Sequence, residues 1–121
     1  MIKKEFKVNT DYNYTLDIYT ITVDEDFDFG KSLEIEDGVI LDFDKNNIPI
    51  SIEILDISKR LSIKKQEVDS STITMRITCT PEVLEICIVF FYKHHDEEFE
   101  KTIDSKLANT FNIPQIELAS T

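Results

Sequence analysis

The segment DFDKNNIPISIE carries the residues best suited to chemistry in this chain. Three oxygen-bearing side chains alternate and a glutamate stands at the twelfth position, which is the ligand spacing of a calcium-binding EF-hand loop: Asp42, Asp44, Asn46 and Glu53. However, Asn47 stands where such loops need glycine, and alternating β-branched residues flank the segment where an EF-hand needs helices. A hairpin with solvated carboxylates is therefore the preferred interpretation, and a calcium site is the alternative.

Two further clusters could hold a metal ion. Asp24, Glu25, Asp26 and Asp28 could supply oxygen ligands to a hard cation, although a solvated loop explains them better. His94 and His95 stand beside two acids and could bind a transition metal, but adjacent residues on a strand point to opposite faces. An exposed turn is the preferred interpretation there.

The remaining chemistry-bearing residues form no catalytic pattern. Cys79 and Cys87 lack CxxC spacing, so we expect two buried thiols in the reducing cytoplasm. No serine lies in a nucleophile elbow, and Gly30 and Gly38 are too few for a phosphate-binding loop. We therefore expect no enzyme activity and no cofactor.

Charge limits the classes of partner. The net charge is −11 and the sequence pI is about 4.5, which would repel nucleic acid and anionic membrane surfaces. The longest apolar run, Val83 to Tyr92, contains Glu85 and is shorter than the roughly 20 residues of a membrane span. MIKKEFKVN has no apolar stretch behind its basic residues, so it does not resemble a signal peptide. A protein partner or a homo-oligomer remains.

The elements that would position these residues are mostly strands. Alternating or β-branched patterns predict strands over residues 14–23, 33–36, 39–44, 48–55, 72–79, 84–92, 99–103 and 113–118. Asp37-Gly38 predicts a tight hairpin turn. Segment 84–92 is the most apolar, so we expect a central strand covered on both faces.

Helices are predicted at two places. Asp56 is a candidate cap for a helix of about two turns running through ISKRLSIKK, and residues 105–111 could form one or two helical turns. Polar residues 66–71 look like a connection. The fold class is a strand-dominated α+β arrangement of antiparallel hairpins with one or two short helices, in a single domain over residues 1–121.

Residues 37–61, DGVILDFDKNNIPISIEILDISKRL, together with YTLDIYTI, resemble a family of small prokaryotic proteins filed as domain of unknown function twenty-two eighty-three. The resemblance covers residues 12–61, so the chain divides into a family-like half, 1–61, and an additional strand-rich half, 71–121. Asn47 stands where the family usually has glycine, and asparagine also tolerates left-handed backbone. The resemblance implies a compact sheet with a helix and carries no activity.

Two functions follow as expectations. The first is a non-enzymatic module that pairs with itself or with another protein through an edge strand or an apolar patch. In a more specific form of this expectation, the module neutralises a basic partner protein. The second is an ion- or small-ligand-binding module that uses the acidic turn from Asp42 to Glu53. A hydrolase with acids brought together from distant segments is a third reading that one sequence leaves open.

Overall fold

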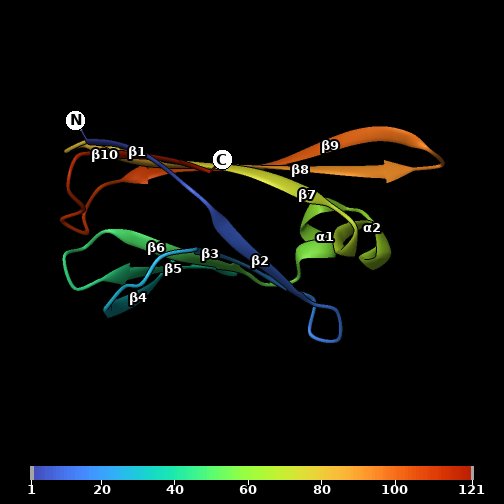
Figure 1. Ribbon diagram of the computed structural model, residues 1–121, viewed down its shortest axis with the longest axis horizontal. Coiled ribbons are helices and arrows are strands. Elements are labelled where there is room, and N and C mark those ends of the chain that lie inside the picture. The colour runs from blue at the N-terminus through green and yellow to red at the C-terminus, as the bar shows by residue number, and fades with distance from the viewer. Residues whose placement is uncertain (1, 121) are drawn as a thin grey trace.

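Two five-stranded sheets lie face to face in the computed structural model, which describes residues 2–120 (Figure 1). The first sheet has the order β2-β3-β6-β5-β4, and the second has the order β1-β10-β7-β8-β9. The strands of the first sheet are β2 (Val8–Asn13), β3 (Ile18–Val23), β4 (Phe29–Glu36), β5 (Val39–Asp44) and β6 (Pro49–Ile54). Those of the second sheet are β1 (Ile2–Phe6), β7 (Thr72–Cys79), β8 (Val83–His94), β9 (Glu97–Ala108) and β10 (Ile116–Ser120).

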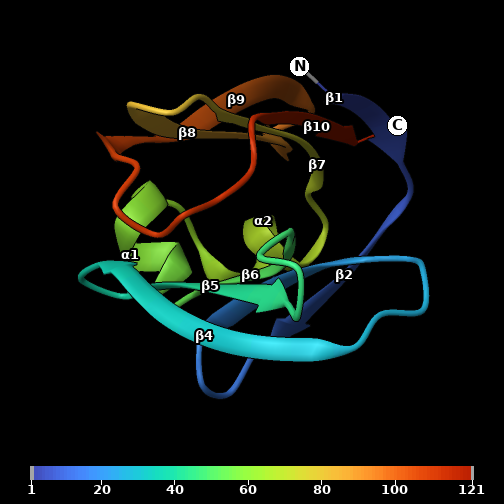
Figure 2. The same ribbon diagram turned by 90° about the vertical axis from the view of Figure 1, so that its left-hand side faces the viewer.

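The chain crosses between the sheets at two places. Lys7 separates β1 from β2, so consecutive strands belong to opposite sheets. Helices α1 (Ile57–Leu61) and α2 (Lys65–Asp69) form the second crossing, between β6 and β7, and lie between the two layers (Figure 2). All neighbouring strands are antiparallel except β1, which runs parallel to β10. The predicted strand-dominated α+β class is confirmed.

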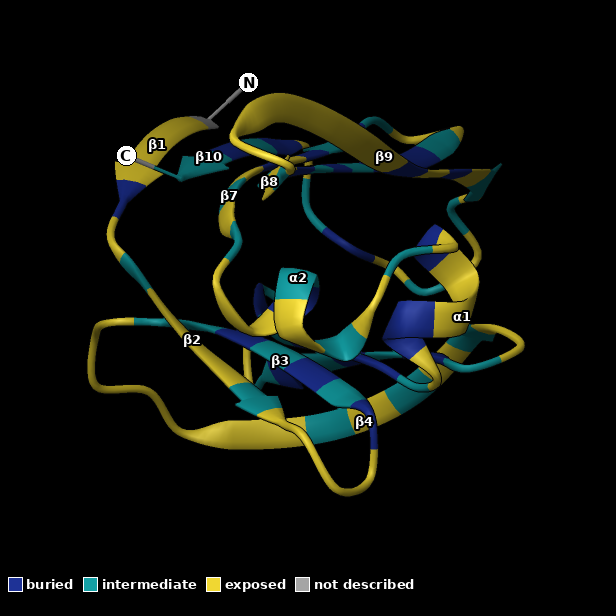
Figure 3. Cartoon of the chain, turned by 90° about the vertical axis from the view of Figure 1, so that its right-hand side faces the viewer, coloured by how far each residue is buried: buried dark blue, intermediate teal, exposed yellow. Residues whose placement is uncertain are grey.

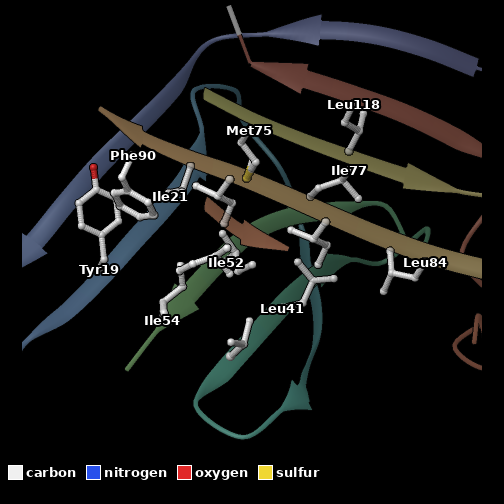
Figure 4. Close-up of a cluster of buried hydrophobic side chains, with 14 of the residues drawn as sticks. Tyr19, Ile21, Leu41, Ile52, Ile54, Met75, Ile77, Leu84, Phe90 and Leu118 are labelled. Atoms are coloured by element: carbon white, nitrogen blue, oxygen red, sulfur yellow. The ribbon is translucent and has the colours of Figure 1, made fainter. Parts of the chain in front are cut away.

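The inner faces of both sheets share one apolar core. Tyr19, Ile21, Leu41, Ile52 and Ile54 of the first sheet face side chains of the second, including Met75, Ile77, Leu84, Phe90 and Leu118 (Figure 4). Burying an aliphatic or aromatic side chain of this size stabilises a fold by about 1.5–3 kcal/mol. Each sheet thus covers the apolar face of the other.

Several predicted elements are confirmed at their predicted bounds. Segments 39–44 and 72–79 are strands β5 and β7, and Gly38 has the positive φ of 79° that its turn requires. Pro49 begins β6, where its missing N–H costs least. No helix among the described residues is long and apolar enough to span a membrane.

Other predictions at the strand level are wrong. Residues 14–17 form the turn between β2 and β3 rather than the start of a strand, because Asp17 adopts left-handed backbone with φ 59°. Residues 105–108 continue β9, where Ser105 pairs with Ile86. Strand β8 is covered on one face only, since Glu85 and Phe91 on its outer face are exposed.

The single helix predicted after Asp56 is two short helices. Ser62 adopts left-handed backbone with φ 57° and ends α1, and α2 follows in the segment predicted as a connection. Asp56 occupies the N-cap position of α1, but its side chain makes no capping hydrogen bond. Its φ of 52° is left-handed, whereas a capping residue needs extended backbone.

Asp17 performs this capping from another part of the chain. Its carboxylate accepts hydrogen bonds from the Ser58 backbone N–H at 3.1 Å, the Ser58 hydroxyl at 2.7 Å and the Tyr12 hydroxyl at 2.7 Å. Asp17 is 5% exposed, and its backbone carbonyl accepts the Ile57 N–H. The β2–β3 turn is therefore fixed to the beginning of α1.

Replacing Asp17 tests this link. Asp17→Ala should lower the free energy of unfolding by about 3 kcal/mol, because it leaves three donors without their acceptor. Asp17→Asn should cost clearly less, since its amide oxygen still accepts and asparagine tolerates left-handed backbone. Urea denaturation measures both; equal losses for the two variants would contradict the link.

The same carboxylate should make stability depend on acid pH. Burial raises the pKa of Asp17, but the hydrogen bonds from Ser58 and Tyr12 outweigh it and hold the pKa below its ordinary value of 3.8. The stabilisation should be complete above pH 3.8 and vanish as the pH falls through the lower folded-state pKa.

The measurement is the difference in unfolding free energy between the wild type and Asp17→Asn across the acid range. Glu67 is common to both proteins, so its own pKa, lowered by the Lys64 N–H and by His94, cancels from the difference. A difference that stays constant through this range would contradict the assignment.

Candidate functional site

The outer face of the first sheet carries two rows of polar side chains that cross all five strands. Directly paired residues point to the same side of a sheet, so the strand registers define each row. The first row consists of Asn9, Thr22, Ser51, Asp42 and Ser32. The second row consists of Asp11, Thr20, Glu53, Ile40 and Glu34. We call these ten positions the acidic face.

The acidic face has negative charge without nearby compensation. Four of its positions are carboxylates and none is lysine or arginine: Asp11, Glu34, Asp42 and Glu53. None of these four takes part in an ion pair within the described chain. Every position on the face is exposed or partly exposed, so the charges remain accessible.

Hydroxyl groups keep the rows ordered. The Thr22 and Ser51 hydroxyl oxygens are 3.1 Å apart, and the Ser32 hydroxyl donates to the Asp42 carboxylate. Asn9 at the edge donates to Asp24 at 3.2 Å. These contacts join neighbouring strands and leave much of each carboxylate free to bind a cation.

The outer face of the second sheet differs because cations lie among its acids and form ion pairs with two of them. Arg76 lies 3.5 Å from Glu117, and Lys106 lies 4.0 Å from Glu85. The two outer faces are both polar, but only the second has lysine or arginine among its paired strand positions, including Arg76, Lys93 and Lys106. That asymmetry distinguishes the acidic face from an ordinary solvated surface.

The predicted calcium ligands lie on this hairpin but do not converge. The Asp44 carboxylate accepts the backbone N–H groups of Asn46 at 2.8 Å and Ile48 at 2.9 Å, which is a local turn. Glu53 pairs with Ile40 at the opposite end of the hairpin, about 13 Å along the strands from Asp44. Strands β5 and β6 flank the turn where an EF-hand has helices.

The acids between β3 and β4 have separate partners. Glu25 pairs with Lys4 at 2.8 Å, Asp28 pairs with Lys45 at 2.8 Å, and Asp24 accepts from Asn9. Among residues 2–120, no group of three or more His, Cys, Asp or Glu side chains is arranged to hold a metal ion.

The histidine rings contact each other with centroids 4.1 Å apart, whereas the two cysteines lie apart. His94 ends β8, and its Nδ1 lies 2.8 Å from the Glu67 carboxylate of α2, while His95 lies in the turn with φ 52°. Cys79 is buried and Cys87 is half-buried, and both are free thiols. They stand on opposite faces of the second sheet, because Cys79 pairs with Leu84 on the inner face and Cys87 with Arg76 on the outer face. Burial raises the pKa of the Cys79 thiol.

A surface hollow of about 590 Å³ has a mixed apolar and polar lining. It lies beside the β8–β9 hairpin and is lined by Ser70, Thr72, Phe91, Tyr92, Lys93 and Glu98. The lining contains neither histidine nor cysteine, and the Ser70 hydroxyl donates to backbone carbonyl groups of α2.

Sequence reasoning found Asp42 and Glu53 but assigned them to a linear loop. Asp11, Thr20 and Glu34 were missed as members of a site, because the rows depend on registers between strands that are far apart in the sequence. The available signal was the alternation of polar with apolar residues in β3, β5 and β6, which only Ile40 interrupts on this face.

The comparisons with known proteins concern the first sheet. Residues 9–58 match the family described as "Protein of unknown function (DUF2283)". The predicted resemblance to this family is confirmed over that segment, which contains all ten positions of the acidic face as well as Tyr12, Asp17 and Ser58. Curated proteins and solved structures give no match.

Calcium provides a direct test of the hairpin. We expect millimolar calcium to leave the amide NMR signals of residues 42–53 unshifted, because Asp44 and Glu53 cannot reach one ion. Magnesium at equal concentration is the control for general ionic effects. Saturable shifts confined to this segment and specific to calcium would contradict the expectation.

Proposed function

We propose that this chain is a non-enzymatic protein-interaction module that binds a basic segment of a partner protein through the acidic face. The observation that carries the proposal is the set of four carboxylates on one flat sheet surface with no cation among its ten positions. Lysine and arginine side chains of a partner would supply the missing charge.

The geometry suits an extended basic segment. Adjacent strands lie about 4.8 Å apart, so each row offers a ladder of polar groups across the whole sheet. The net charge of −11 would also speed the approach of a cationic partner at low salt. The second sheet would attract such a partner less, because Arg76 and Lys106 lie among its outer acids.

The side chains of the acidic face also contribute little to the stability of the fold. The apolar core lies on the other side of the sheet, so the outer carboxylates are free to serve binding. Their place within the matched segment, residues 9–58, supports a role shared by that family unit. A cytoplasmic location belongs to the proposal and is supported by the two free cysteines.

The test neutralises the acidic face without changing its shape. The variant combines Asp11→Asn, Glu34→Gln, Asp42→Asn and Glu53→Gln, and its affinity for a short oligolysine peptide is measured by calorimetry. We expect the affinity to fall by roughly tenfold or more, because four favourable charge contacts are lost.

A matched control separates position from net charge. Glu5→Gln, Glu85→Gln, Glu98→Gln and Asp104→Asn remove the same charge from exposed positions on the outer face of the second sheet. The control should bind the peptide almost as well as the wild type. Equal losses of peptide affinity in both variants would show that net charge alone controls binding and would refute the proposal.

The same two variants decide whether a natural partner uses this face. In a tagged pull-down from the native host, a stoichiometric partner should be retained by the control and lost by the acidic-face variant. A partner retained by both would bind elsewhere, which would also contradict the proposal.

A further inference from the structure

Strand β9 forms a long regular edge of the second sheet. It pairs with β8 over twelve residues in an unbroken register, and no strand of the described chain covers its other side. Figure 3 shows most of β9 as exposed. A regular edge leaves a row of backbone N–H and C=O groups available to another strand.

The other edges are less suited to pairing. β4 has register shifts near Gly30 and Ile35, and such bulges distort the hydrogen-bonding edge. β1 and β2 have only 5 and 6 residues. The β8–β9 hairpin also extends past the first sheet (Figure 1), so a neighbouring molecule would find this part of the edge open.

We propose that β9 pairs antiparallel with β9 of a second copy of this chain, in the register that places Ile103 opposite Ile103, to form a homodimer with one continuous sheet. This dimer uses the second sheet and is independent of the acidic face. The charge pattern of β9 favours a second copy of this chain as the partner strand.

Symmetry restricts the possible registers. A two-fold axis perpendicular to the sheet places outward residues opposite outward residues. The axis must therefore pass midway between one residue and the same residue of the other copy, and that residue defines the register. With Ile103 on the axis, Glu100 lies opposite the other copy's Lys106, and this pair occurs twice. On the inner side Phe99 lies opposite the other copy's Leu107, which joins two apolar side chains.

The neighbouring registers bring like charges together. An axis through Thr102 places Glu100 opposite Asp104 of the other copy. An axis through Asp104 or Lys101 places that residue opposite its own copy. Like charges directly opposite each other destabilise a strand pair, which disfavours these three registers. An axis through Ser105 avoids like charges, since it places Asp104 opposite Lys106, but it joins only residues 102–108 of each copy. The axis through Ile103 joins residues 98–108, so this register is the one that the sequence of β9 favours.

The residues that would meet are exposed in the single chain. The Lys106 side chain is 66% exposed, and its contact with Glu85 at 4.0 Å leaves its ammonium able to bind a second carboxylate. Phe99 is 42% exposed, although it stacks on Tyr92 with ring centroids 5.9 Å apart. Pairing would cover apolar surface that the isolated chain leaves in water.

Charge reversal tests both the dimer and its register. Sedimentation velocity over a concentration series should show a monomer–dimer equilibrium for the wild type. Glu100→Lys and Lys106→Glu should each weaken the dimer by roughly tenfold, since each creates two like-charge pairs. The double variant should recover affinity, because the pair is restored with its charges exchanged.

Lys7→Glu is the matched control, since it reverses an exposed charge between β1 and β2, beside the opposite edge of the second sheet and away from β9. It should leave the dimer constant unchanged, and thermal unfolding should show that every variant is folded. A wild type that remains monomeric at all accessible concentrations, or a double variant that recovers nothing, would overturn the proposal.

Disulfide trapping determines directly which residues of the two β9 strands lie opposite each other. In a Cys87→Ser background, Glu100→Cys combined with Lys106→Cys should give a covalent dimer under mild oxidation, because opposite residues approach closely. Within one chain these two positions are about 20 Å apart along the strand, so they cannot join. Trapping of Glu98→Cys with Lys106→Cys instead would assign the axis to Thr102 and overturn the register.

Discussion

The need to cover one apolar sheet face governs this structure. The first sheet presents Ile21, Leu41 and Ile52 on one side, and a sheet with such a face is stable only when another layer covers it. The second sheet supplies that layer with its own apolar side. The matched segment, residues 9–58, builds only the first sheet and the start of α1, so it depends on the rest of the chain for its core.

This division assigns different tasks to the two sides of each sheet. Inner positions are constrained by packing, whereas outer positions are free to vary in charge. The outer side of the second sheet places Arg76 and Lys106 among its acids, while the acidic face of the first sheet has no cation among its ten positions. The uncompensated charge of the acidic face is the asymmetry on which the proposed binding of a basic partner rests.

Elements with strong alternation of apolar and polar residues could be predicted from the sequence. Elements that depend on backbone conformation or on tertiary contacts could not. Strands β5 and β7 follow from their patterns, but β1 and β2 were missed because these edge strands bury few side chains and carry mixed polar residues. The break between α1 and α2 depends on the left-handed backbone at Ser62. The cap supplied by Asp17, 41 positions from Ser58, and the rows of the acidic face arise from tertiary contacts that no local pattern contains.

The parallel pairing of β1 with β10 has a consequence for biosynthesis. Strands β2 to β6 form neighbouring hairpins and a short return, so the first sheet can assemble soon after it leaves the ribosome. β1 is synthesised before all of them, yet its partner is the last strand of the described chain. The nascent chain must therefore expose the apolar face of the first sheet until β7 and β8 have been made, and β1 must wait unpaired until β10 follows, which leaves both open to misassembly in the interval.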